Sequence, residues 1–198
     1  MNAPARKPQV LALSGSIRTG SYNTTLLREA VEIAESRRAE VRTLQPDELD
    51  LPFYNGDLEA RAGLPDKAVA IKTRIAAADG LLIASPAYNG SISPLLKNAL
   101  DWASRPIADE PRLACFAGKP AALVSASPGP GGGANGLAHA RDVLTVLSAR
   151  VLQASLSVPA AYEAFDEDNH LKSDELRRDL EYLVDQLLHE AAKPRTSS

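Results

Sequence analysis

Short apolar runs alternate with longer amphipathic stretches along most of the chain. The apolar runs have the length of buried strands and lie at Val10–Ser14, Glu40–Leu44, Gly80–Pro86, Lys119–Ser127 and Val151–Val158. The stretches between and after them repeat apolar residues at helical spacing and lie at Thr24–Ser36, Pro65–Ala78, Pro94–Ala103, Asn135–Ala149 and Ser173–Ala192. This alternation predicts an α/β fold of parallel strands joined by right-handed helical crossovers.

Five strands that are apolar throughout favour a doubly wound sheet with helices on both faces. The segment Pro46–Gly63 breaks the pattern with prolines and glycines, and we expect a long irregular loop there. The 198 residues suggest one domain, 1–198, with short mobile tails at both ends. In such a sheet, ligands bind beyond the carboxyl ends of the strands, where the strand order reverses.

Composition narrows the class of protein. The net charge of −3 argues against a dedicated partner of nucleic acid or of an anionic membrane. A single cysteine, Cys115, excludes an internal disulfide framework and fits a reducing compartment, so we expect a cytoplasmic protein. Three widely spaced histidines give no zinc motif, so no metal is expected, and no apolar run is long enough to span a membrane.

The first loop, "SGSIRTGSYN", follows the first strand and leads into a helix. Its glycines allow close backbone approach, and Ser21 or Asn23 can cap the helix, whose free amides favour an anion. Arg18 adds a positive charge suited to phosphate. Gly15 and Gly20 have the spacing of a Walker A loop, but serine follows where that motif requires lysine, so a triphosphatase loop is not expected. A well-capped polar turn without a ligand is the alternative.

The second loop, "SPAYNGSISP", follows the third strand. Asn89 and Gly90 are typical of a tight turn. Tyr88 is suited to lie against a flat ring, although it could equally be a core residue with a satisfied hydroxyl group.

The third loop, "SASPGPGGGANG", follows the fourth strand. Gly129, Gly131 and Ala134 match a dinucleotide fingerprint, but the loop does not follow the first strand. The acidic residue that the fingerprint requires about 20 residues later is also absent from 151–155. The glycines favour close approach to a ligand, and a long surface loop is the alternative. Together the three loops suit a phosphate, a planar ring and close backbone contact, which are the three demands of flavin mononucleotide (FMN).

The motifs "SGSIRTGSYN", "LPFYNGDLE", "SPAYNGSISPLLKNALDW", "GKPAALVSASPGPGGG" and "LAHARDVLTVL" occur in this order. With them the chain, from Val10 to about Val158, resembles the NADPH-dependent FMN reductase family, which includes flavodoxin-like quinone, chromate and azo reductases. The resemblance implies a flavodoxin-like five-stranded sheet of order 2-1-3-4-5 and non-covalent FMN. It also implies hydride from NADPH or NADH, a quinone, free flavin or similar small-molecule acceptor, and a homodimer or homotetramer.

The resemblance also assigns roles to residues of the three loops. Those expected around the FMN phosphate are Ser16, Arg18, Ser21, Tyr22 and Asn23. Those expected along the isoalloxazine edge are Pro86, Ala87, Tyr88, Asn89 and Gly90. Ser127 and the glycines near Gly132 would close the third side, and the segment around Phe53 and Tyr54 resembles the loop that reaches toward a neighbouring subunit's flavin.

One position departs from the family pattern. Many relatives have glutamate where Ala87 stands, so a carboxylate that could join subunits or shape the acceptor pocket is missing here. FMN binding itself should not need this carboxylate.

No side chain is expected to act as a catalytic acid or base, because the flavin carries the hydride. His139 is expected on a helix surface, Trp102 in packing, and Cys115 outside the redox chemistry. Two alternatives stay open beside the reductase: a flavodoxin-type electron carrier without its own NAD(P)H oxidation, and a flavin-free interaction subunit.

Overall fold

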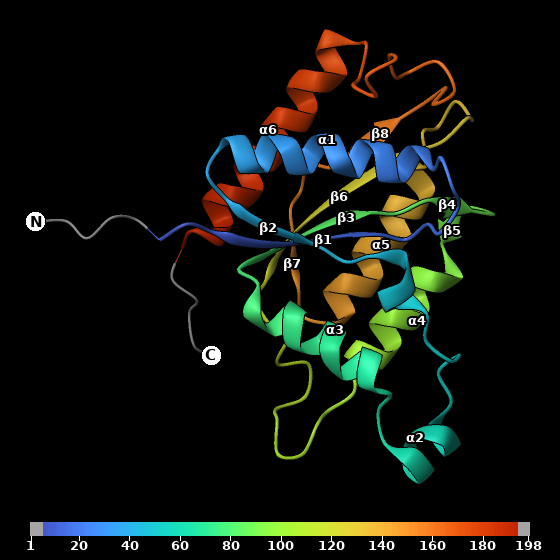
Figure 1. Ribbon diagram of the computed structural model, residues 1–198, viewed down its shortest axis with the longest axis vertical. Helices are drawn as coiled ribbons and strands as arrows, with labels where there is room; N and C mark the ends of the chain where they lie inside the picture. Colours follow the sequence, from blue (N-terminus) through green and yellow to red (C-terminus); the bar gives the residue numbers. More distant parts are fainter. Residues whose placement is uncertain (1–5, 194–198) are drawn as a thin grey trace, which may run out of the picture.

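The computed structural model describes residues 6–193, in which a parallel sheet lies between two layers of helices (Figure 1). The strands of this sheet are β1 (Gln9–Ser14), β2 (Glu40–Thr43), β3 (Gly80–Ala84), β6 (Pro120–Ala126), β7 (Arg150–Val151) and β8 (Leu156–Val158). One face is covered by α1 (Tyr22–Ser36) and α6 (Asp174–Ala191), and the other by α3 (Asp66–Ala77), α4 (Pro94–Ala103) and α5 (Ala134–Val146). The chain therefore has the predicted α/β architecture, with helices on both faces.

The sheet order is β2-β1-β3-β6, with β7 and β8 both pairing in parallel with the outer side of β6. This confirms the flavodoxin-like order 2-1-3-4-5. The fifth strand is interrupted, whereas the sequence predicts one run. Arg141 of α5 accounts for the gap, because its guanidinium donates to the carbonyl oxygens of Leu152 (2.6 Å) and Gln153 (3.0 Å). Those carbonyls are thereby paired outside the sheet.

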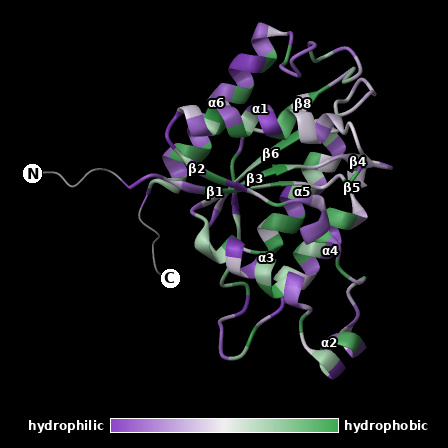
Figure 2. Cartoon of the chain, viewed as in Figure 1, coloured by the Kyte–Doolittle hydropathy of each residue, from purple (hydrophilic) through white to green (hydrophobic). Residues whose placement is uncertain are grey.

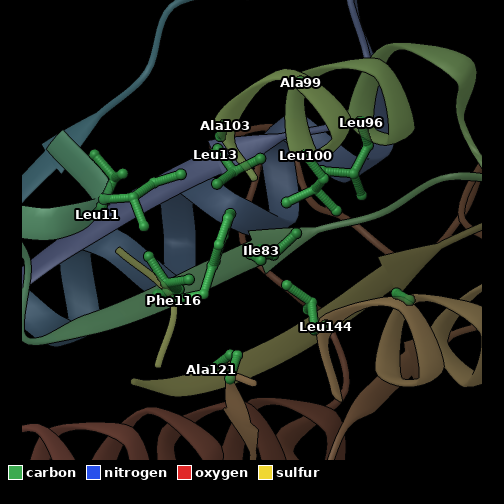
Figure 3. Packing of buried hydrophobic residues seen from close by; sticks show 14 of the residues in the cluster. Leu11, Leu13, Ile83, Leu96, Ala99, Leu100, Ala103, Phe116, Ala121 and Leu144 are labelled. Atoms are coloured by element: carbon green, nitrogen blue, oxygen red, sulfur yellow. The ribbon is translucent and has the colours of Figure 1, made fainter. Parts of the chain in front are cut away.

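The alternation of side chains along each strand divides the core into two clusters. Leu11 and Leu13 of β1 point to the side of α3, α4 and α5, where they pack near Ile83 (Figure 3). Val10 and Ala12 point to the side of α1 and α6. Apolar residues lie along the strands, and the hydrophilic positions of the helices are largely on their outer sides (Figure 2). The continuous apolar runs in the sequence follow from burial on both faces.

The expectation of an irregular loop over Pro46–Gly63 is wrong in part. A 3₁₀ helix, η1 (Pro46–Leu49), and a short helix, α2 (Gly56–Ala62), form inside it. Asn55 caps α2 by accepting from the amides of Asp57 and Leu58, while Gln45 and Glu48 form a reciprocal capping box around η1. Local side-chain caps thus create helical turns where proline and glycine suggested none.

The two ends of the sheet are clearly separated in space. In Figure 1 the described chain begins and ends near the amino ends of the strands, and the start of α1 lies at the opposite, carboxyl edge. The outermost residues of the expected tails, 1–5 and 194–198, lie outside the described residues. Between residues 6 and 193, no helix has both the length and the apolar character needed to cross a membrane.

Candidate functional site

Direct hydrogen bonds join the three loops at the carboxyl edge of the sheet. The Gly15 amide donates to the carbonyl oxygen of Ala84 at 2.8 Å, and the Ser93 hydroxyl donates to the Gly15 carbonyl oxygen at 2.6 Å. The Asn23 side chain exchanges two bonds with the backbone of Ala126, at 2.8 and 3.1 Å. The first loop therefore contacts both others, as the strand order predicts.

The first loop has the features expected of an anion site around the start of α1. Ser21 occupies the N-cap position but makes no side-chain capping bond, so the first amides of α1 receive no acceptor from it. The exposed guanidinium of Arg18 lies over the Tyr22 ring, with its central carbon 5.4 Å from the ring centroid. Within residues 6–193 this guanidinium forms no ion pair. Free amides, a helix dipole and an unpaired cation together favour a bound phosphate.

Two polar residues of the first loop are already engaged with the protein. Asn23 is buried, and both ends of its amide are used on β6. The Ser16 hydroxyl is also buried and accepts from the Arg18 amide at 3.3 Å. In this structure Asn23 joins the first loop to the third, and Ser16 shapes the turn that carries Arg18.

The second loop is a hairpin rather than an open loop. Its strands are β4 (Ala87–Tyr88) and β5 (Ser91–Ile92), joined by Asn89 and Gly90, which both have positive φ angles (51° and 79°). Two consecutive residues of this kind define a type I′ turn, which explains the Asn-Gly pair. Tyr88 is 48 % exposed, so the alternative of a core tyrosine is wrong. Pro86, in contrast, is buried beneath the hairpin.

Neighbouring glycines of the third loop have opposite surroundings. A Cβ atom on Gly132 would lie 2.8 Å from the carbonyl carbon of Val158, and one on Gly133 would lie 2.1 Å from the Ser125 Oγ. Both glycines therefore serve close packing inside the protein. A Cβ atom on Gly131 would meet nothing within 4 Å. Close approach to a ligand is therefore open at Gly131, while Gly132 lies against β8.

The two serines of this loop also differ. Ser127 is half-buried and its hydroxyl accepts from the Gly129 amide at 3.3 Å. Ser125, at the end of β6, has a fully buried hydroxyl with no hydrogen-bond partner in the described part of the chain. Sequence reasoning did not single out Ser125, because serine inside an apolar strand carries no signal of a missing partner.

The assembled site fits FMN on three observations. The first loop has an unpaired cation at a helix start, the second presents a half-exposed aromatic ring, and the third has a glycine that faces open space.

Residues 6–193 contain no group of three or more metal-ligating side chains, and Cys115 is buried, which raises the pKa of its thiol. His139 lies on the exposed surface of α5, with Nδ1 3.1 Å from the Ser91 hydroxyl.

Comparison with known proteins shows the family of the chain. Residues 8–163 match the family described as NADPH-dependent FMN reductase. The chain belongs to this family. It is 39 % identical to the NAD(P)H-dependent FMN reductase of Pseudomonas aeruginosa over 170 residues, which cover 85 % of this chain and 87 % of the relative. It is also 39 % identical to a quinone reductase of Escherichia coli K12 over 148 residues, 75 % of each chain.

A solved structure gives the same assignment. The flavoenzyme NAD(P)H:(acceptor) oxidoreductase FerB from Paracoccus denitrificans superposes with a TM-score of 0.79 at 31 % identity, covering 93 % of this chain and 97 % of that one. The predicted family, fold and enzyme class, an NAD(P)H-dependent FMN reductase, are thereby confirmed. FMN and NAD(P)H are the cofactor and electron donor of this class.

In this FMN reductase, hydrogen bonds fix the backbone on both sides of a second exposed aromatic residue, Phe53. We call this set of bonds, made by Trp102 and Asn98, the clamp. The Trp102 indole is fully buried and donates to the carbonyl oxygen of Pro52 at 2.7 Å. Asn98 donates to the same oxygen at 3.0 Å and accepts from the Tyr54 amide at 2.8 Å. Phe53, between these anchored residues, is 81 % exposed. The clamp therefore fixes the backbone while leaving one large apolar side chain in solvent.

A charged pair extends the clamp at its outer side. The Arg105 guanidinium binds the Glu59 carboxylate at 2.8 and 2.9 Å and holds the pKa of that carboxyl group below its usual value. The Tyr54 hydroxyl donates to the same carboxylate at 2.9 Å, which raises the pKa of Tyr54. These contacts stabilise the segment around Phe53.

Proposed function

We propose that this chain binds FMN non-covalently among the three loops and reduces a quinone, free flavin or similar small acceptor at the expense of NADPH or NADH. The observation that supports this most directly is the unpaired Arg18 at the uncapped start of α1. Arg18 lies on the first loop. The second loop carries the half-exposed Tyr88, and the third carries Gly131, which faces open space. Arg18 is thus suited to the FMN phosphate, Tyr88 to its ring, and Gly131 to close backbone contact with it.

When bound, FMN supplies the hydride chemistry, and the protein supplies position and electrostatics. Arg18 and the first amides of α1 would hold the phosphate, and Tyr88 would flank the ring. The residues proposed to surround the cofactor remain Ser16, Arg18, Ser21, Tyr22, Asn23, Pro86, Ala87, Tyr88, Asn89, Gly90, Ser127 and Gly132. Asn23 would contribute mainly by fixing the loop, since its side chain already binds β6.

Assembly and location are part of the same proposal. The clamped and exposed Phe53 is suited to a homodimer or homotetramer contact, since a large apolar side chain in solvent favours burial against a partner. Ala87 in place of the family's glutamate would alter the acceptor pocket or this assembly. We further propose one domain over residues 1–198. We also propose a cytoplasmic location, supported by the single cysteine of the chain, Cys115, which is buried.

The proposal is tested by absorption spectroscopy of the purified protein. The protein is mixed with FMN, desalted, and then treated with NADPH in the absence of oxygen. A retained yellow band that bleaches at once, followed by reoxidation on adding a quinone, is the expected result. A retained band that does not bleach would favour an electron carrier. Loss of the band together with no NADPH oxidation in excess FMN would overturn FMN binding.

Replacing Arg18 with alanine should weaken FMN binding by about 1.5–3 kcal/mol, the contribution of a hydrogen bond to a charged group. This corresponds to roughly 10- to 150-fold in affinity. Flavin fluorescence titration measures it, with Arg28→Ala as the control, because Arg28 is exposed on α1 and its ion pair within residues 6–193 is with Glu32. An unchanged affinity in Arg18→Ala would remove this residue from the phosphate site.

A further inference from the structure

A stack of three side chains connects the first loop to a segment far along the chain. The Arg18 guanidinium lies over the Tyr22 ring, at 5.4 Å from its centroid. The Tyr22 ring is in turn stacked with Phe165, with centroids 6.4 Å apart and ring planes 4° apart. Both distances lie within the ranges of attractive cation–ring and ring–ring contacts. Phe165 belongs to none of the motifs that define the site.

Phe165 is held firmly by its own segment. It forms an antiparallel bridge with Leu171, and the Lys172 amide donates to the Ala164 carbonyl oxygen at 2.9 Å. The Leu171 amide donates to the carboxylate of Glu29 at 2.9 Å, and Glu29 is buried on α1. The segment 164–172 is therefore fastened to the helix whose first residue is Tyr22.

Arg18, in contrast, has little else to fix its head group. It is exposed and lies over the Tyr22 ring, and within the described range its guanidinium forms no hydrogen bond or ion pair. An unrestrained arginine loses considerable side-chain entropy when it binds a ligand. A ring that already holds the guanidinium reduces this loss.

We propose that Phe165 is a positioning residue for the phosphate: it holds Tyr22, which holds Arg18, so that the preference for FMN over riboflavin depends on segment 164–172. This inference rests on the proposed function, because it takes the first loop as the phosphate site. Phe165 itself would contact no part of the cofactor.

The test compares the affinities of the protein for FMN and for riboflavin, which lacks the phosphate, by fluorescence titration. Phe165→Leu should weaken FMN binding about 3- to 10-fold, or about 0.7–1.4 kcal/mol, and leave riboflavin binding within about twofold. Phe165→Tyr, which keeps the ring, should restore the FMN affinity. Tyr162→Leu is the matched control, because Tyr162 is an exposed aromatic residue of the same connection without a ring partner.

A double-mutant cycle separates positioning from general loosening of the fold. If Phe165 acts through Tyr22, then Phe165→Leu should have no further effect on FMN affinity in a Tyr22→Leu background. Tyr22→Leu alone leaves segment 164–172 unchanged in sequence and should also lower the affinity for FMN but not for riboflavin. It therefore tests the stack even if Phe165→Leu does not fold.

The outcomes distinguish this inference from the proposed function. Equal losses for both flavins, or additive effects in the cycle, would overturn the positioning role while leaving the flavin site intact. Failure of the unaltered protein to bind FMN at all would overturn the proposed function, and this inference with it.

Discussion

Polar groups at the amino end of the sheet are paired between elements, whereas several groups at the carboxyl end are exposed or have no partner in the described part of the chain. At the amino end, the buried Asp79 carboxylate accepts from the Gln9 amide at 2.9 Å and pairs with Arg6. The buried Lys119 ammonium donates to the Ala78 carbonyl oxygen. Each of these contacts joins segments that are distant in the sequence, so this end stabilises the fold.

The carboxyl end is built from the same strands, but several of its polar and aromatic groups lack such pairing. Arg18 has no ion pair among the described residues, the Ser125 hydroxyl has no partner there, and Tyr88 is half-exposed. Groups at this end that are paired, such as Asn23, connect the loops to one another. The difference indicates that polar contacts between distant segments are concentrated at the amino end, while the groups proposed to bind the ligand lie at the carboxyl end of the same sheet.

The largest effect is expected at a glycine of the carboxyl end that serves packing. Gly133→Ala places a Cβ atom 2.1 Å from the Ser125 Oγ, at a residue whose φ of 89° disfavours side chains. We expect the free energy of unfolding to fall by about 2–5 kcal/mol, measured by urea denaturation.

Gly131→Ala is the matched control, because it makes the same change two residues earlier where nothing lies within 4 Å. It should leave stability nearly unchanged. Equal stability of the two variants would show that the third loop relaxes around the added methyl group, and that Gly133 is not required for packing against Ser125.

An effect of intermediate size is expected at the amino end. Asp79→Ala removes the charged acceptor of the Gln9 amide and the partner of Arg6, so we expect a loss of about 1.5–3 kcal/mol in unfolding free energy. Affinity for FMN, measured below the denaturant transition, should not change. The exposed Asp109→Ala should alter neither quantity. A parallel loss of flavin affinity in Asp79→Ala would contradict the inference that contacts at the amino end do not affect ligand binding at the carboxyl end.

This contrast also explains which features the sequence could predict. The positions of the strands and helices, and a sheet covered on both faces, follow from apolar runs and their spacing, which depend on neighbours along the chain. The strand order came instead from the resemblance to a known family. The proposed anion site could be inferred because Arg18 and the start of α1 lie close together in the sequence. These features need no knowledge of distant contacts.

Other features depend on distant contacts that leave no local signal. The gap in the fifth strand depends on Arg141 of α5, and the stack on Tyr22 depends on Phe165. Adjacent glycines in "PGGG" are equivalent as letters, yet Gly131 faces open space and Gly132 faces β8. Their roles are decided by three-dimensional packing alone.

A smaller effect is expected at the hairpin of the carboxyl end. Tyr88→Ala should weaken FMN and riboflavin binding equally, by about 0.5–1.5 kcal/mol or roughly 2- to 13-fold, because it removes a ring contact and no phosphate contact. Tyr182→Ala is the control, since Tyr182 is similarly exposed but lies on α6. A loss confined to FMN would place Tyr88 at the phosphate, and so would change the orientation of the cofactor on the three loops.

The smallest effect concerns an ion pair beyond the amino end. Glu190 of α6 accepts hydrogen bonds from Lys193, at 2.6 Å, and from Arg150 at the start of β7, and these lower its pKa from 4.5 to about 2. Because folding lowers this pKa, the stabilisation is present above pH 4.5 and is lost as the pH falls through about 2. In Glu190→Gln, the unfolding free energy should therefore fall less steeply with acidification over this window, as measured by urea denaturation at several pH values. Flavin affinity at neutral pH should be unaffected, because the pair lies at the end of the sheet that supports stability. An unchanged acid profile would show that solvent screens the pair completely, and would limit the stabilising contacts of this end to its buried groups.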